Sequence, residues 1–110
     1  KSDVIFSNLN GPMNADIDTE SRTAYFPCSQ EIVVCNLQQN KIERRISNPL
    51  FNDLHSVNLN RNTGSLLVVS SGADKIVELD ALDHVLWQWD AARFAEEHGL
   101  TGTPYSETVV

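Results

Sequence analysis

Basic residues, cysteines and long apolar runs are all scarce in this 110-residue chain. It has 8 lysines and arginines against 15 aspartates and glutamates, which gives a net charge of −7 at pH 7. Nucleic acids and anionic membrane surfaces attract proteins through clustered basic side chains, so this balance argues against both as partners. No apolar run approaches the roughly 20 residues that span a bilayer. The composition is that of a soluble globular protein, and it leaves the compartment open.

The only two cysteines, Cys28 and Cys35, flank a predicted hairpin. With the turn at residues 29–31, Cys28 faces Ile32 across the hairpin and Cys35 faces Tyr25. That register separates the thiols by roughly 10 Å along the strands and places them on opposite faces of the sheet. We therefore predict two buried free thiols, because unpaired cysteine is among the most buried residue types.

Sequence motifs of several common enzyme classes are missing as well. The chain has no glycine-rich phosphate loop, no G-x-S-x-G elbow, no C-x-x-C and no H-E-x-x-H. Its aspartates do not follow the spacing of a calcium-binding loop, and Asp80 is predicted to form a turn. No metal site is predicted, and no cofactor is indicated.

What the chain does contain is one pattern that occurs twice, over residues 14–46 and 55–89. Ile17 and Leu59 occupy equivalent places 42 residues apart, and Ile32 and Ile76 stand 44 apart because the second copy has a longer turn. A period of about 40 to 45 residues that holds four short strands is typical of a propeller blade. The sequence therefore predicts an all-β fold of two consecutive four-stranded antiparallel propeller blades.

The expected strands follow from alternating apolar residues between turn residues. In the first blade they cover residues 15–18, 23–28, 32–37 and 41–46. In the second blade they cover residues 55–59, 66–71, 75–80 and 85–89. Pro27 lacks an N–H group, so a bulge is expected beside it. A short helix over about 91–98 follows, with Asp90 as N-cap and Gly99 as C-cap, and short β-prone stretches lie at 3–6 and 107–110.

Two blades do not make a closed ring, which takes roughly 4 to 8. We expect residues 1–110 to form a single propeller segment whose apolar faces are covered by further blades. These blades would belong to the same polypeptide, as Lys1 in place of methionine favours, or to other copies, for instance three chains that form six blades. Val85, Trp87 and Trp89 are predicted to share one face, and both tryptophans are expected to pack between blades.

The innermost strands of a propeller line its central channel, where residues from several blades can converge on a ligand. His55 opens that strand in the second blade, where it can act as a general acid or base, or only hydrogen-bond a neighbouring blade. Asn14 holds about the equivalent place in the first blade, and Asp16 follows it. We therefore predict that Asn14, Asp16 and His55 bind a ligand, with His55 as the single catalytic candidate. His84 and His98 are assigned to a solvated turn and to the helix C-terminus.

The second copy, with His55, L-L-V at 66–68, I-V-E-L-D at 76–80 and V-L-W-Q-W at 85–89, resembles blades of bacterial arylsulfotransferase-like and NHL-like propellers. The first resemblance implies transfer of a sulfuryl group between phenolic compounds by channel histidines and an arginine. The second implies lyases in which histidines from separate blades hold a metal. Only His55 maps onto these positions, so any other site residues would come from other blades.

Three functions are compatible with this pattern. The leading hypothesis is a scaffold or binding module with small-molecule or partner contacts on the channel face and loops. The alternative is part of a propeller enzyme, a transferase or a lyase, with His55 at the central site. A third possibility is a self-assembling lectin-like ring, which would have one ligand site per repeat.

Overall fold

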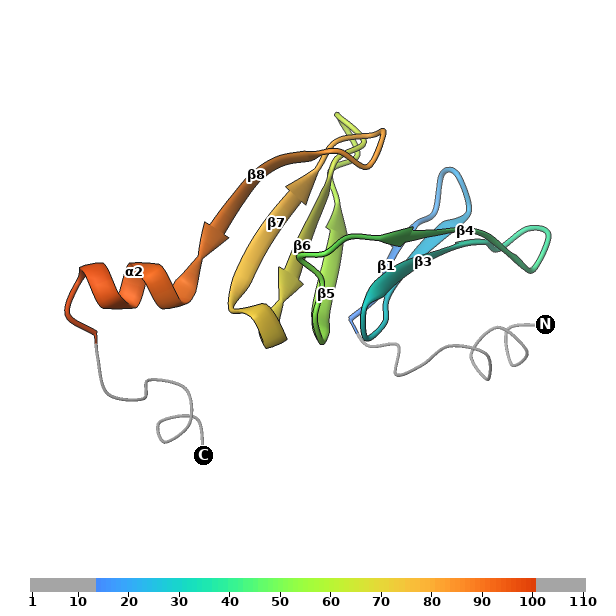
Figure 1. The fold of residues 1–110 in the computed structure, drawn as a ribbon. Coiled ribbons are helices and arrows are strands. Elements are labelled where there is room, and N and C mark those ends of the chain that lie inside the picture. Colours follow the sequence, from blue (N-terminus) through green and yellow to red (C-terminus); the bar gives the residue numbers. More distant parts are fainter. Residues whose placement is uncertain (1–13, 101–110) are drawn as a thin grey trace.

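The computed structural model describes residues 14–100, and within them the chain is mostly β, with two four-stranded antiparallel sheets and one short helix (Figure 1). The first sheet contains β1 (Asp16–Asp18), β2 (Thr23–Pro27), β3 (Glu31–Asn36) and β4 (Lys41–Ser47). The second contains β5 (Leu54–Leu59), β6 (Leu66–Ser70), β7 (Lys75–Leu79) and β8 (Val85–Asp90). Helix α2 (Ala91–Glu97) follows β8. The β-prone stretches at 3–6 and 107–110 lie outside the described residues.

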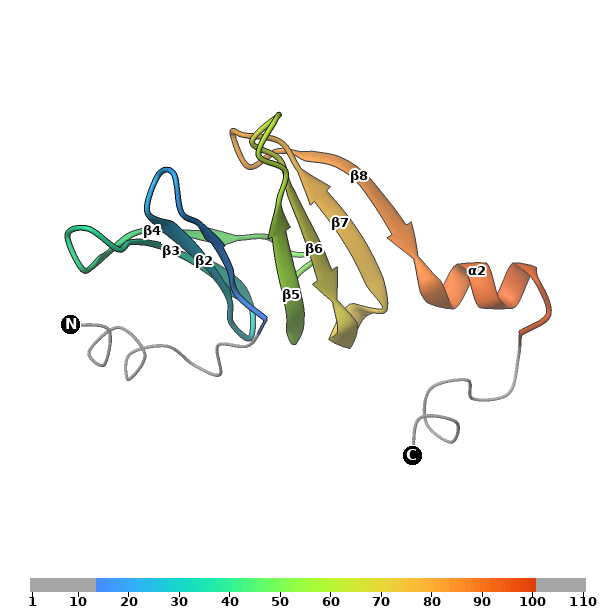
Figure 2. The ribbon, with the colours of Figure 1, turned by 180° about the vertical axis from the view of Figure 1, so that it is seen from behind.

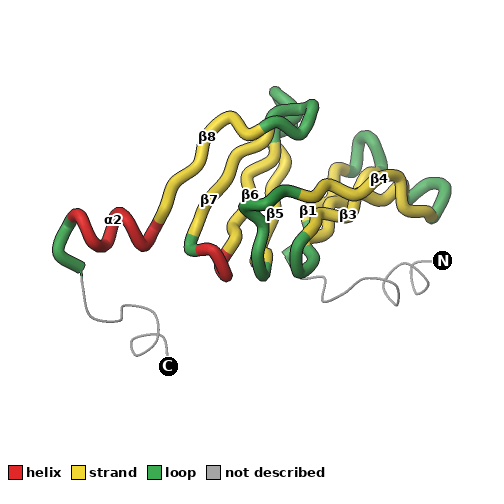
Figure 3. The backbone as a smooth tube through the Cα atoms, viewed as in Figure 1, coloured by secondary structure: helices red, strands yellow, loops and turns green. Residues whose placement is uncertain are grey.

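Each sheet is a simple meander in which every strand pairs with its neighbours in sequence, so the spatial orders are β1-β2-β3-β4 and β5-β6-β7-β8. Short loops join the strands, as the tube in Figure 3 shows, and a single 3-10 turn, η1 (Ser71–Ala73), connects β6 to β7. The predicted all-β architecture of two four-stranded antiparallel sheets with a short helix near the C-terminus is confirmed. The strand boundaries differ from the predicted ones by at most one residue.

The hairpin that carries the cysteines has a different register from the predicted one. Its turn is tighter than expected, because the Cys28 N–H donates to the Glu31 carbonyl at 2.8 Å. Cys35 consequently pairs with Ala24 instead of Tyr25. Cys28 and Cys35 also belong to the same buried cluster, so the prediction that they lie on opposite faces was wrong. Both thiols are buried, as predicted, and they form no disulfide with each other.

The predicted bulge at Pro27 is absent from the described strands β2 and β3, which pair without a register shift. Pro27 is the last residue of β2 and lies opposite Ile32. The neighbouring strand β1 is only three residues long and pairs with residues 23–25. Proline is tolerated here because β2 has no partner strand at this point on the β1 side.

The main core lies between the two sheets, which stack face to face. Its buried members come from both sheets and from the link between them: Ile32, Val34, Ile46, Phe51, Leu54, Val57, Leu66, Val68, Val77 and Leu79. A smaller cluster covers the other face of the first sheet: Ala24, Phe26, Cys28, Val33 and Cys35. Strands β2 and β3 are therefore buried on both faces, which explains why β3 contains the uninterrupted apolar run at 32–35 instead of an alternating pattern.

The outermost strand of the second sheet, β8, has no buried residue. Five of the six residues of β8 are exposed, and Figure 2 shows the strand bending away from the rest of the sheet toward α2. A register shift leaves Leu86 without a partner, so that Val85 pairs with Leu79 and Trp87 pairs with Glu78. This bulge moves Val85 to the opposite face from the tryptophans, so the prediction that the three share one face was wrong.

Helix α2 begins and ends as its capping residues predict. The Asp90 side chain accepts a hydrogen bond from the Arg93 N–H at 3.0 Å, which satisfies a free donor of the first turn. Gly99 follows the helix with φ of +70°, a conformation that glycine adopts without strain. The Phe94 ring lies 5.3 Å from the Trp89 ring and holds the helix against the end of β8. Among residues 14–100 no helix is long and apolar enough to cross a membrane.

Candidate functional site

Strands β1 and β5, the first strands of their sheets, lie side by side at the inner edge of the stack (Figures 1 and 2). Each has a paired neighbour on one side only, because β1 and β5 end the two strand orders. The first strands of the two repeats therefore meet at this edge. Asn14 and His55, two of the three predicted ligand-binding residues, are brought together here and both are exposed.

Asn14 is held beside His55 by two contacts of a single atom. Its Nδ2 donates to the His55 carbonyl oxygen at 2.9 Å and lies 3.3 Å from the His55 Nδ1. A carbonyl oxygen can only accept, so the atom that faces it must be the amide nitrogen, which is a donor to the ring as well. Nδ1 therefore acts as an acceptor, and in the neutral ring the proton is on Nε2. His55 thus offers an N–H donor to a ligand at the exposed edge.

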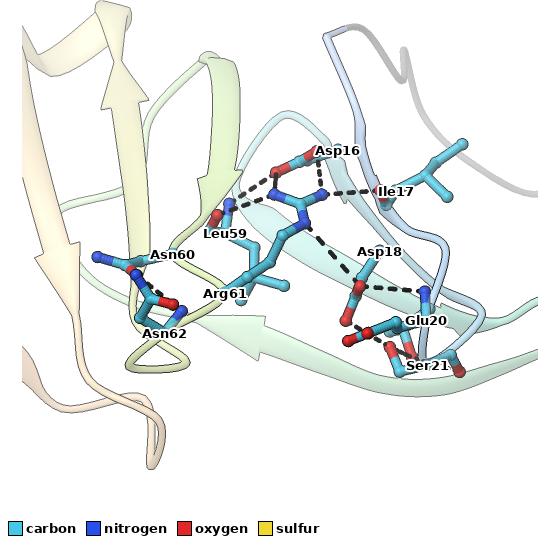
Figure 4. Close-up of polar contacts among 10 residues, drawn as sticks. Asp16, Ile17, Asp18, Glu20, Ser21, Leu59, Asn60, Arg61 and Asn62 are labelled. Atoms are coloured by element: carbon cyan, nitrogen blue, oxygen red, sulfur yellow. Dashed lines mark hydrogen bonds and ion pairs between the residues drawn. The ribbon is translucent and has the colours of Figure 1, made fainter.

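Asp16, the third predicted residue, is engaged in a contact between the sheets (Figure 4). One of its carboxylate oxygens accepts from the Leu59 N–H at 2.8 Å, and the other accepts from Nη2 of Arg61 at 3.0 Å. The same Nη2 donates to the Ile17 carbonyl oxygen at 2.8 Å. Asp16 therefore joins the first sheet to the β5–β6 turn, and its oxygens already have protein partners.

The charge environment of Asp16 follows from these contacts. Its partial burial by itself raises the pKa of the carboxyl group, but hydrogen bonds from Arg61 and from the Leu59 N–H, together with the Arg61 charge, outweigh that effect. The net result is that the pKa of Asp16 lies below the usual value for aspartate. The carboxylate stays ionised at neutral pH, as an ion pair with Arg61 requires.

Arg61 was not predicted as part of the site. The sequence places it in the turn between two strands, where an arginine carries no signal of function. Its importance depends on the stacking of the sheets, which brings the turn over β1. Its Nε also lies 3.9 Å from Asp18, whose other oxygen accepts from the Ser21 hydroxyl at 2.8 Å. Arg61 therefore contacts both acidic residues of β1.

The remaining predicted polar residues have local structural roles. Asp80 forms the predicted turn, because its Oδ1 accepts from the N–H groups of Leu82 and His84 at 2.8 Å each. The side chain of His84 is 73% exposed in that turn. His98 ends the helix, with Nδ1 3.0 Å from the Phe94 carbonyl oxygen. Each role agrees with the sequence-based interpretation.

A polar hollow of the described surface lies away from the β1–β5 edge. It has a volume of about 830 Å³ and lies between the β2–β3 turn and the link to the second sheet, lined mainly by polar residues such as Gln30, Ser47 and Asn48. Over residues 14–100 no three histidine, cysteine, aspartate or glutamate side chains are grouped closely enough to hold a metal ion. The candidate site is therefore an open edge with hydrogen-bonding groups.

Comparison with known proteins adds no assignment, since no protein-family model matches the chain and no curated protein matches it in sequence.

Proposed function

We propose that the chain is a β-propeller segment that serves as a scaffold or binding module, with ligand contacts at the edge formed by β1 and β5 and in the adjoining loops. Two features support the propeller assignment. The two sheets have the same meander order, and they stack with their first strands adjacent. Continued stacking in the same sense would place the first strand of each further sheet beside β1 and β5, around a common channel.

The observation that carries the binding function is the pairing of Asn14 with His55. These side chains come from different repeats and converge at an exposed edge, with the Nε2 proton of His55 left to donate. A suitable ligand is a small polar molecule with a hydrogen-bond acceptor, such as a carboxylate or a sulfate ester. Further blades, from the same or other chains, are the structural partners in this proposal.

Chemical-shift mapping of the full chain tests the binding function. We expect titration with acetate or phenyl sulfate to shift the His55 ring and the Asn14 side-chain amide, with saturation at one ligand per chain. His55→Ala removes the donor and abolishes the response. His84→Ala provides the matched control, because His84 is an exposed histidine outside this edge. Shifts that persist unchanged in His55→Ala contradict the proposal.

The second candidate is an arylsulfotransferase-like transferase or NHL-like lyase with His55 at its centre. The exposed, hydrogen-bonded ring of His55 is the observation that favours it. Binding is better supported, because a general base needs a free nitrogen lone pair, whereas Nδ1 faces the Asn14 donor and Nε2 carries the proton. Sulfuryl transfer from p-nitrophenyl sulfate to phenol by the intact assembly, lost in His55→Ala and kept in His84→Ala, would establish the enzyme instead.

A further inference from the structure

The second sheet has an apolar face that the first sheet does not cover and that helix α2 contacts at Trp89, through Phe94. We call it the open face. Its members on β6 and β7 alternate with core residues of those strands, and the face continues onto β8: Leu67, Val69, Ile76, Trp87 and Trp89. Leu67 is 42% exposed, Trp87 48% and Trp89 36%. A hollow of about 390 Å³ lies on it beside Val69, Ile76 and Trp89. Apolar side chains gathered in this way on one surface mark an interaction site.

The internal repeat identifies what the open face corresponds to. In the first sheet Tyr25, Val34 and Arg44 lie opposite one another, as do Ile32 and Ile46. In the second sheet the same pairings join Leu67, Glu78 and Trp87, and join Ile76 and Trp89. The open face is therefore the equivalent of the surface by which the first sheet packs on the second.

The existing interface also shows which polar contacts accompany this packing. The first sheet supplies Asp16, which accepts from the Leu59 N–H and from Arg61 of the second sheet. It also supplies Arg44, which pairs with Asp83 in the β7–β8 turn. The Asp16 position is held in the second sheet by Asn58, since Asn58 pairs with Leu67 as Asp16 pairs with Tyr25. Asn58 can accept the same backbone N–H.

We propose that the open face docks a third four-stranded repeat of this kind, in the orientation in which the first sheet docks on the second. The occupant presents an aliphatic sheet face, like that of Val57, Leu66 and Val68, and a backbone N–H opposite Asn58. It also carries a donor or a cation opposite Glu78, whose carboxylate stands where the first sheet has Val34. This inference rests on the stacked-repeat part of the proposed function and is independent of the ligand edge.

A second copy of the chain is a poorer occupant. The face that would have to dock, the far side of the first sheet, is already buried, with Ala24, Val33 and Cys35 each 0% exposed. Two open faces packed against each other would enclose two Glu78 side chains in apolar surroundings. Although the Ser65 hydroxyl donates to the Glu78 carboxylate, enclosing two like charges in one apolar interface is costly, so the complementary third repeat is favoured.

Insertion of a repeat into the full chain tests the proposal. Ser47 and Asp90 are equivalent, because they pair with Glu31 and Lys75 at the ends of β3 and β7. A duplicate of residues 48–90 is therefore inserted directly after Asp90, with its tryptophans replaced by phenylalanine. Because the docking face of this duplicate is aliphatic, Glu78 of the native copy is changed to valine, the residue at this position in the first sheet. The two native tryptophans then report on the open face. We expect acrylamide quenching of their fluorescence to fall severalfold and their emission to shift to shorter wavelength.

Substitutions of native residues of the second sheet, made in the chain that carries the duplicate, make the test specific. Ile76→Lys, at the centre of the open face, restores quenching, whereas Leu82→Lys, in a turn where Leu82 is 74% exposed, does not. Asn58→Asp gives the duplicate's copy of Arg61 a carboxylate partner, as Asp16 does for Arg61 in the existing interface. This variant should protect the tryptophans further from acrylamide. Because a misfolded duplicate would also leave the tryptophans exposed, the dispersion of its amide signals is measured in the same samples.

Two results overturn the proposal. One is unchanged quenching when the duplicate is folded. The other is sedimentation of the unmodified chain as a dimer that Ile76→Lys dissociates and Leu82→Lys does not, which assigns the open face to a second copy. Neither result affects the chemical-shift response of His55 to acetate or phenyl sulfate. Failure of the docking proposal and failure of the ligand site can therefore be told apart.

Discussion

The two sheets place equivalent residues in opposite environments. In the first sheet Ile32 is 0% exposed and Val34 is 2% exposed, because the second sheet covers them. In the second sheet the equivalent face remains open, and its outer strand exposes both tryptophans. The two faces share strand order, register and position in the repeat. What distinguishes them is the presence of a neighbour, so burial in this chain is a property of the stack and not of the single sheet.

This comparison also explains the difference in sequence between the sheets. Strand β3 can be apolar throughout at 32–35 because both of its faces are covered. Strand β7 has Glu78 in the place of Val34, and the Glu78 carboxylate accepts a hydrogen bond from the Ser65 hydroxyl at 3.1 Å. A charged residue at this position indicates that the next interface, if formed, is more polar than the first.

The largest expected effect is the difference in stability between truncations of two adjacent leucines of β6. Leu66 is 2% exposed between the sheets, and Leu67 is 42% exposed on the open face. Leu66→Ala should lower the free energy of unfolding by about 2–5 kcal/mol, because it removes buried contacts and leaves a cavity. Leu67→Ala should change it by only about 0.5 kcal/mol. Urea denaturation measures both, and equal losses would show that the open face is covered.

A smaller loss is expected in the turn that makes the second repeat longer. A Cβ atom on Gly72 would lie 2.8 Å from the Asn52 carbonyl oxygen, which already accepts a hydrogen bond from the Gly72 N–H. Gly72→Ala should therefore force the turn away from the link and cost about 1–3 kcal/mol. Gln30→Ala, in the exposed equivalent turn of the first repeat, serves as the control. Equal thermal unfolding of both variants would disprove this contact.

The contact between Arg61 and Asp16 should give a pH-dependent difference. Because the folded pKa of Asp16 lies below its usual value, the contribution of its carboxylate to stability is fully present above the pKa of the unfolded chain. It is lost as the pH falls through the folded pKa. Arg61→Gln should therefore reduce stability at neutral pH, with a deficit that shrinks in acid. Denaturation at a series of pH values measures this change.

The Arg93–Glu97 pair provides the matched control for the Arg61 experiment. It is an ion pair within the helix, with side chains 75% and 57% exposed, so solvent screens it. Arg93→Gln should leave the free energy of unfolding almost unchanged at every pH. A deficit of Arg61→Gln that persists unchanged in acid would mean that Arg61 acts through packing and not through Asp16.

The smallest effects concern the accessibility of side chains in the unmodified protein. Cys28 is 3% exposed and Cys35 0% exposed, and burial, together with the neighbouring Cys28, raises the pKa of the Cys35 thiol. A thiol reagent should therefore modify the native protein only slowly, since the reactive form is the accessible thiolate. Acrylamide should quench the tryptophans in the same sample. Rapid labelling of the thiols, together with tryptophans that acrylamide does not quench, would show that the cysteine side of the first sheet is accessible and that the open face is covered.

Much of the fold could be predicted from the sequence, because alternation of apolar residues and turn chemistry act locally. The repeat, the strand boundaries and the Asp90 cap follow from such signals. Both register errors arose where a shift of one residue changes which residues pair and which face of the sheet a side chain occupies. The tight turn after Cys28 shifted the pairing of β2 with β3, and the unpaired Leu86 moved Val85 to the other face.

The candidate site could be predicted only in part. Placing His55 and Asn14 at equivalent points of the repeat was enough to name both residues. Their contact depends on how the sheets stack, and so does the role of Arg61, which reaches β1 from a turn of the other repeat. Alternation within one strand carries no information about such contacts, because they join residues more than 40 positions apart.

The most direct test of the stacked arrangement is a comparison of methyl nuclear Overhauser effects at Ile32 and Ile76, which hold the same position in the two repeats. The core between the sheets predicts strong effects from the Ile32 methyl groups to Val57 or Val68 of the second sheet. It predicts none from Ile76 to the first sheet. Effects that connect Ile76 to the first sheet, or none between Ile32 and the second, would contradict the stacked arrangement.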